Sequence, residues 1–163
     1  MEKNCILKVL KERLANATCW NEKQKAYHRE IIKVARPVKC VPAADVLDEY
    51  QLEYVKRYIV PEARHCYRNA CLLAEAFPDI LYVEGMTAVP FDTEHAFNKV
   101  GDQYIDITFE FALGEDPRKF PYISIAEYDS VQVDEFVRQT GGYGEFYRFN
   151  WWVTKELNTH IEL

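Results

Sequence analysis

Three residues near the middle of the chain combine side-chain types that could act together in nucleophilic catalysis. They occur in the order Cys66, His95 and Asp106. A thiolate is a strong nucleophile, an imidazole can accept and return a proton, and a carboxylate can hold the imidazole in one orientation. We therefore first ask whether the sequence predicts elements that would bring these three side chains together.

Cys66 lies at the start of a helix that the apolar spacing predicts over residues 65–77. The unpaired N–H groups and the positive end of the dipole at a helix amino terminus favour a thiolate, and Arg64 and Arg68 add positive charge nearby. The same N–H groups could stabilise an oxyanion formed by attack on a carbonyl. The simpler alternative is that Cys66 is a small, buried apolar residue.

His95 and Asp106 lie in a predicted β-hairpin. The strands are expected over residues 95–100 and 103–109, joined by Gly101-Asp102, a pair typical of two-residue turns. In this register His95 and Asp106 project from one face as diagonal neighbours, about 7–8 Å apart between backbones. The carboxylate can then bond one imidazole nitrogen and leave the other for the thiol. The alternative is a strand histidine beside an unrelated exposed aspartate.

These residues resemble the transglutaminase-like core of the papain-like cysteine protease superfamily. That family pattern reads roughly His-Ala-Trp-Asn-x-Val, a Gly turn, an aromatic residue and Asp-x-Thr, with an aromatic residue often following the Cys. The matching residues here are His95-Ala96-Phe97-Asn98-Lys99-Val100, Gly101, Tyr104, Asp106-Ile107-Thr108 and Tyr67. The resemblance covers residues 66–109, and Phe97 replaces the usual Trp.

The resemblance implies that Cys66 is the nucleophile, His95 the general base and acid, and Asp106 the orienting residue. The implied activity is acyl transfer through a Cys thioester, which cleaves or deamidates a peptide or protein amide. Water is the default acceptor, and transamidation to an amine is an alternative. No cofactor and no metal are expected.

The predicted fold is α+β, with the Cys66 helix packed on a small antiparallel sheet, as in a papain-like or transglutaminase-like core with additional amino-terminal helices. Helices are expected first and mostly antiparallel strands later, in one domain spanning residues 1–163. Its parts would be a helical amino-terminal region, 1–60, and a catalytic-type core, 61–153. The other predicted helices cover residues 3–15, 22–35, 45–59 and 130–140, and the other predicted strands cover 80–85 and 145–153.

Charge and composition exclude several classes of protein. The 163 residues are 48% apolar and 28% charged, which excludes a disordered chain, and no apolar run is long enough for a membrane helix. The formal charge is −6, which argues against general nucleic-acid binding. Residues 1–40, however, hold ten Lys and Arg against four Asp and Glu. This basic segment either packs on the acidic remainder or docks an acidic protein partner.

The five cysteines follow no metal-binding or disulfide spacing, so we expect free thiols in a cytoplasmic protein. Two other functional hypotheses remain beside the enzyme. One is a catalytically silent protein-binding module with a papain-like fold, and the other is a metal-binding structural protein that would add His65 to the three residues above. No spacing identifies a side chain for the oxyanion hole, for which His65, Gln51 and Tyr54 are candidates.

Overall fold

The computed structural model describes residues 5–89 and 91–161, and it has the mixed α+β architecture expected from the sequence. Five antiparallel strands form one curled sheet in the order β1-β5-β2-β3-β4. The strands are β1 (Arg36–Val38), β2 (Ile80–Ala88), β3 (Asp92–Val100), β4 (Gln103–Ile105) and β5 (Tyr122–Tyr128).

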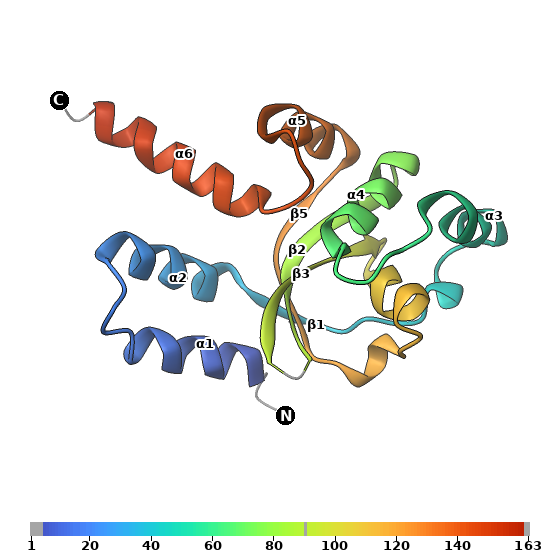
Figure 1. Ribbon diagram of the computed structural model, residues 1–163, viewed down its shortest axis with the longest axis horizontal. Coiled ribbons are helices and arrows are strands. Elements are labelled where there is room, and N and C mark those ends of the chain that lie inside the picture. The colour runs from blue at the N-terminus through green and yellow to red at the C-terminus, as the bar shows by residue number, and fades with distance from the viewer. Residues whose placement is uncertain (1–4, 90, 162–163) are drawn as a thin grey trace.

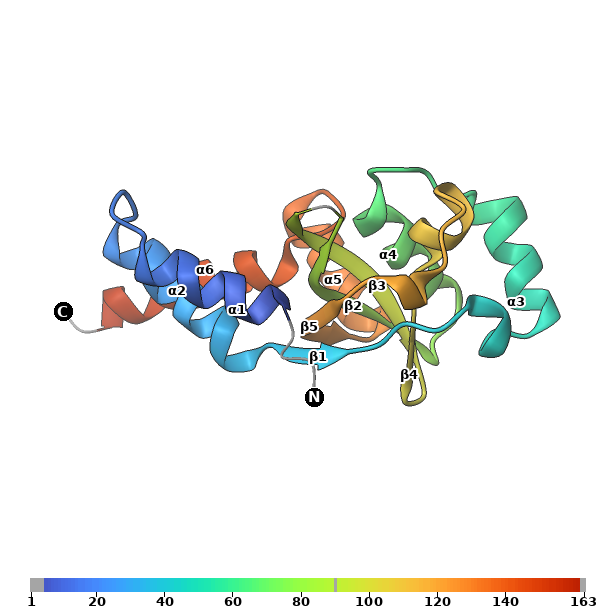
Figure 2. The ribbon, with the colours of Figure 1, turned by 90° about the horizontal axis from the view of Figure 1, so that it is seen from below.

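The longer helices surround this sheet (Figure 1). They are α1 (Cys5–Ala15), α2 (Glu22–Val34), α3 (Glu49–Tyr54), α4 (Cys66–Ala76), α5 (Ser130–Thr140) and α6 (Phe146–Ile161). In both ribbon views α1, α2 and α6 lie together at one side of the sheet, and α3 lies at the other (Figure 2).

Helix α4 packs directly on the central strands of the sheet. Ala70 and Ala74 form a buried cluster with Tyr82 of β2 and Ala96 of β3. The Asn98 side-chain amide also donates to the carbonyl of Ala70, at 2.9 Å. Small residues on the helix permit this close approach, which brings the start of α4 beside β3.

Within the described residues, three helices begin with a capping box, in which side chain and backbone bond reciprocally. Asn21 caps α2, Asp48 caps α3 and Asp129 caps α5, each paired with a Gln three residues later. At its other end α5 stops at Gly141, whose φ of 74° is the left-handed conformation that glycine adopts readily. The predicted end of this helix is therefore confirmed.

The carboxyl-terminal segment differs most from the sequence expectation. The predicted strand over residues 145–153 is wrong, because residues 146–153 belong to α6. Its Trp151 and Trp152 rings therefore meet edge to face, 5.2 Å apart, and do not occupy opposite faces of a strand. The helix begins where the buried Glu84 carboxylate accepts the N–H groups of Phe146 and Tyr147, at 2.7 and 3.0 Å.

Three smaller corrections concern the other elements. The helix predicted over residues 45–59 is interrupted: a 3₁₀ turn covers Ala43–Asp45, and α3 runs into a π-helical turn at Val55–Ile59. The strand predicted over 103–109 ends at Ile105. Strands β1 and β5 were not predicted. The two-residue turn at Gly101-Asp102 and its flanking pair, Val100 opposite Gln103, are confirmed.

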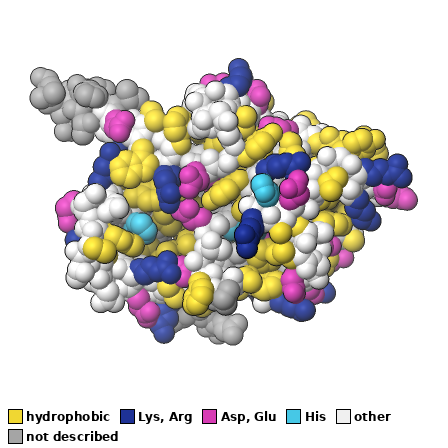
Figure 3. Space-filling view, in the orientation of Figure 1, with side chains coloured by type: hydrophobic (Ala, Val, Ile, Leu, Met, Phe, Trp, Pro, Cys, Tyr) yellow, Lys and Arg dark blue, Asp and Glu magenta, His cyan; other side chains and the backbone are white. Residues whose placement is uncertain are grey.

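The basic amino-terminal segment packs on the rest of the chain. Ile6 and Leu10 of α1 and Ile31 of α2 form a buried cluster with Met86 and Ile123 of the sheet. Acidic and basic side chains are interspersed over the face seen in Figure 3, with no large area of a single charge.

Candidate active site

Cys66 is the first residue of α4, and its side chain is half-buried. Unlike the helices with capping boxes, α4 has no side-chain cap, since His65 at the N-cap position makes no such bond. The first N–H groups of a helix have no partner within it. In α4 they therefore remain available for a group that arrives beside the thiol.

The loop that leads into Cys66 contains two residues in the left-handed backbone conformation. Val60 and Arg64 both have positive φ values, 47° and 67°, which are uncommon for residues other than glycine. The buried Asn69 holds this loop: its amide nitrogen donates to the Glu62 carbonyl at 2.9 Å and to the Thr108 hydroxyl at 3.0 Å. Asn69 therefore supports the segment before Cys66 and does not lie on the helix surface.

The predicted contact between His95 and Asp106 is present. His95 Nε2 lies 2.6 Å from Asp106 Oδ2, and the two residues are 5% and 1% exposed. His95 is on β3, whereas Asp106 directly follows β4, at the point where the chain leaves the sheet. The pair therefore connects β3 with the turn that follows β4.

Asp106 also explains why β4 is shorter than predicted. Its Oδ1 accepts the N–H groups of Thr108 and Phe109, at 3.0 and 3.1 Å. These bonds begin a single π-helical turn at Thr108–Ala112 and end the extended conformation. The carboxylate therefore has one oxygen for the backbone and one for His95.

Cys66 lies close enough to the His95 imidazole to contribute, after Asp106, to raising the pKa of that ring. Because Asp106 occupies Nε2, Nδ1 is the ring nitrogen left for Cys66. Burial of the ring lowers the pKa of His95, but the charge and hydrogen bond of Asp106, together with Cys66, outweigh burial and raise that pKa to about 10. A pKa of about 10 corresponds to an imidazole that is protonated at neutral pH beside the Asp106 carboxylate.

Sequence reasoning missed two residues near Asp106, one tyrosine and one cysteine. The Tyr122 hydroxyl donates to Asp106 Oδ2 at 3.0 Å, and Cys40 lies close enough to Tyr122 for each to affect the pKa of the other. Both side chains are buried. No local spacing connects these residues to Asp106, so only the folded arrangement reveals them.

The other side chains that the sequence suggested, as charges near Cys66 or as oxyanion-hole donors, are less well placed for those roles. The Arg68 guanidinium turns back to the Ile59 carbonyl, at 3.3 Å, and Arg64 and His65 are exposed. The Gln51 side chain is engaged in the cap of α3. Tyr54 packs on Phe77, at the end of α4 opposite Cys66. Backbone N–H groups of α4 are therefore better placed than Gln51 or Tyr54 to bind an oxyanion.

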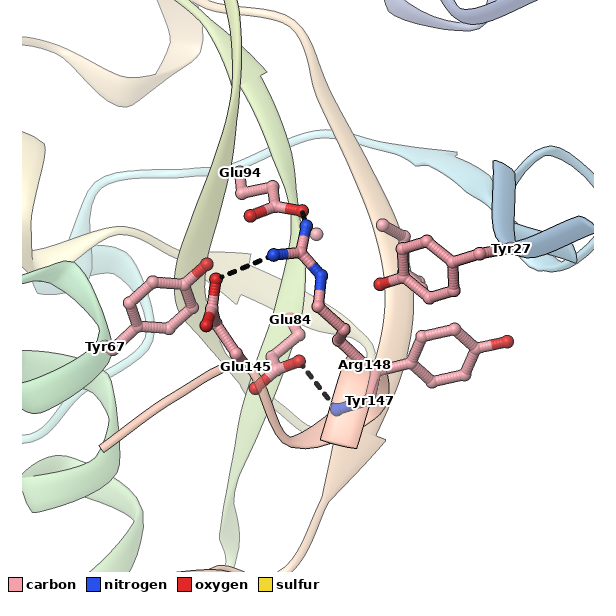
Figure 4. Close-up of a pocket in the computed structure, with 9 residues that line it drawn as sticks. Tyr27, Tyr67, Glu84, Glu94, Glu145, Tyr147 and Arg148 are labelled. Atoms are coloured by element: carbon pink, nitrogen blue, oxygen red, sulfur yellow. Dashed lines mark hydrogen bonds and ion pairs between the residues drawn. The ribbon is translucent and has the colours of Figure 1, made fainter. Parts of the chain in front are cut away.

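A small depression is lined by residues that neighbour Cys66 and His95 in the sequence. It encloses about 290 Å³, part of it open to solvent, and Tyr67 and Glu94 line it next to Cys66 and His95. Arg148 projects from α6 between Glu94 and Glu145 and pairs with both (Figure 4). These polar side chains are thus already partnered by one another.

The described residues hold no group of three or more His, Cys, Asp or Glu side chains that could bind a metal ion together. No helix in the described part of the chain is both long and apolar enough to cross a bilayer. No family model matches the chain, and neither does any curated protein or solved structure.

Proposed function

We propose that the protein is a thiol-dependent acyl-transfer enzyme in which Cys66 is the nucleophile, His95 the acid and base, and Asp106 the orienting residue. The observation that carries the proposal is the buried 2.6 Å contact between His95 and Asp106 beside the half-buried thiol. It supports a site with a transglutaminase-like arrangement within the papain-like superfamily.

The proposed reaction starts from a thiolate beside the protonated imidazole. The sulfur attacks an amide carbonyl, and the N–H groups at the start of α4 stabilise the oxyanion. His95 then gives its proton to the departing amine, which leaves a thioester on Cys66. The neutral imidazole next takes a proton from water as the water attacks the thioester, and the acid product and the free thiol are released.

A peptide or protein amide is the proposed substrate, and water is the proposed acceptor. Attack by an amine on the same thioester would give transamidation. The cytoplasm is the proposed location, because the nucleophile must stay reduced and all five thiols are unpaired.

Selective alkylation tests this proposal. At pH 6 an ordinary thiol, with a pKa of about 8.5, is less than about 1% ionised, whereas a thiolate held by an imidazolium reacts readily. We expect iodoacetamide at pH 6 to modify Cys66 before Cys5 and Cys19, although those two side chains are more exposed. Peptide mapping identifies the modified residue, and Cys71, which is buried, is the unreactive internal reference.

Two variants and one acyl donor complete the test. His95→Ala should slow Cys66 alkylation by about tenfold or more, and Asp106→Asn should affect turnover more than alkylation, because it mainly misorients the ring. Intact mass after incubation with p-nitrophenyl acetate should reveal an acyl adduct on Cys66. If Cys66 reacts no faster than Cys5, or if His95→Ala leaves its rate unchanged, the enzyme hypothesis gives way to a catalytically silent binding module.

A further inference from the structure

Tyr122 completes a chain of hydrogen-bonded side chains behind the candidate triad. It is the first residue of β5 and is fully buried. Its hydroxyl donates to Asp106 Oδ2, the oxygen that also contacts His95. Because Oδ1 is already held by two backbone N–H groups, the hydroxyl restrains the one oxygen that orients the imidazole.

The Tyr122 hydroxyl is the donor in its hydrogen bond with Asp106, because a carboxylate oxygen can only accept. A tyrosine hydroxyl has one proton, and in Tyr122 that proton is directed to Asp106. Burial, followed by the charge of Asp106, raises the pKa of Cys40 well above its usual value and so keeps its S–H proton. Burial and Asp106 also raise the pKa of Tyr122, so its hydroxyl remains a donor.

We propose that Tyr122 is a positioning residue of this site, which holds Asp106 in the orientation that directs His95 toward Cys66. This inference rests on the proposed function. In this role Tyr122 contacts neither the Cys66 thiol nor the substrate, and it acts through Asp106.

Removing the hydroxyl should change the His95–Asp106 pair in a defined direction. With Tyr122→Phe, Oδ2 loses one donor and the proton that it shares with His95 is held more tightly. The ring of Phe would keep the packing that Tyr122 makes with Phe97, whose centroid is 5.2 Å away. The expected change is therefore electrostatic and orientational, with the packing retained.

Tyr82→Phe is a matched control. Tyr82 is also fully buried in the sheet, and its hydroxyl donates to a buried carboxylate, Glu84 Oε1, at 2.8 Å. Both substitutions remove one buried O–H···carboxylate bond, but only Tyr122 contacts Asp106. An effect of lost stability alone should appear in both variants.

The experiment combines histidine NMR with turnover of p-nitrophenyl acetate by the full chain. In Tyr122→Phe the His95 titration midpoint should rise and the signal of its Nε2 proton should move, with assignment by a His95→Gln variant. The kcat should fall about tenfold with KM nearly constant, as for other partners that orient a reacting group from behind. Tyr82→Phe should leave the His95 signals and the pH profile unchanged.

Site-specific 3,5-difluorotyrosine at position 122 gives a second variant in case Tyr122→Phe does not fold. A fluorinated phenol is a stronger donor, so the His95 midpoint should move downward. Unchanged His95 signals in the folded position-122 variant, or equal changes in Tyr82→Phe, would overturn the positioning role. Failure of every form, wild type included, to turn over the ester would contradict the proposed function alone, because the NMR result still decides the role of Tyr122.

Discussion

His95 keeps its charge in surroundings where burial alone would remove it. The ring is 5% exposed, and the contact with Asp106 is what raises its pKa from the ordinary 6.5 to about 10. A histidine whose pKa rises on folding binds protons more strongly in the native state than in the unfolded state. The pair therefore couples protonation to stability.

This coupling predicts that the free energy of unfolding decreases as the pH rises. The contribution of His95 is fully present below about pH 6.5, its unfolded pKa, and is lost progressively as the pH approaches the folded pKa of about 10. The slope cannot exceed about 1.4 kcal/mol per pH unit for one group. Urea unfolding between pH 6.5 and 8.5 measures it, in a range below the ionisation of ordinary tyrosines.

His95→Gln should abolish most of this slope, since glutamine does not titrate. His65→Gln is the control, because His65 is exposed at the start of α4. Equal slopes in the wild type and His95→Gln would mean that the His95–Asp106 pair does not carry the pH dependence.

At the scale of elements, the segment between α5 and α6 is constrained by its contact with Tyr67, the residue after Cys66. An added Cβ at Gly144, whose φ is 95°, would lie 2.3 Å from the Tyr67 ring, whereas Gly142 has open space around it. We expect Gly144→Ala to lower the free energy of unfolding by about 2–4 kcal/mol, from backbone strain and overpacking.

Gly142→Ala should change the same quantity by less than about 0.5 kcal/mol, as surface substitutions usually do. Urea unfolding of both variants at one pH makes the comparison. Similar stabilities for the two variants would show that the close approach of Gly144 to Tyr67 is not maintained in solution.

Elements with local signals were predictable, and those that depend on distant residues were not. The periodicity of α2 and the turn at Gly101-Asp102 are contained in adjacent residues, and both predictions are confirmed. The segment after Glu145 has many aromatic residues, which favour strands. It becomes a helix where Glu84, distant in the sequence, satisfies its first N–H groups.

The contacts of the candidate site also fall into those with a local sequence signal and those that depend on distant residues. The His95–Asp106 contact follows from a short hairpin, so counting residues outward from the turn was sufficient. Tyr122 reaches Asp106 from β5, and no sequence spacing expresses that contact. The signal for β5 was a short run between Pro121 and Asp129 that contains isoleucine and tyrosine, residues that favour strands.

For the molecule as a whole, the basic amino-terminal region is joined to the acidic remainder by both apolar and ionic contacts. Arg13 pairs with Asp92 at 2.8 Å, and Arg36 pairs with Glu127 at 3.4 Å. Strand β1 also makes this region part of the sheet. These contacts favour docking on the body of the protein, and an acidic protein partner for the same region stays a prediction.

Limited proteolysis tests this docking. At low salt we expect trypsin to leave the bonds after Lys33 and Lys39 uncut, because both lie beside the paired backbone of β1. Protein in urea supplies the control, in which both bonds should be cut. Rapid cleavage at Lys39 with the remainder still folded would instead indicate a detachable segment.

The position of β5 in the sheet has a consequence for biosynthesis. This strand lies between β1 and β2, so the two earlier strands become part of one sheet only through a segment made after both of them. Cys66 and His95 leave the ribosome before Tyr122 does. A nascent chain that ends before β5 therefore lacks the hydroxyl that contacts Asp106, and the surroundings of the thiol are completed only late in synthesis.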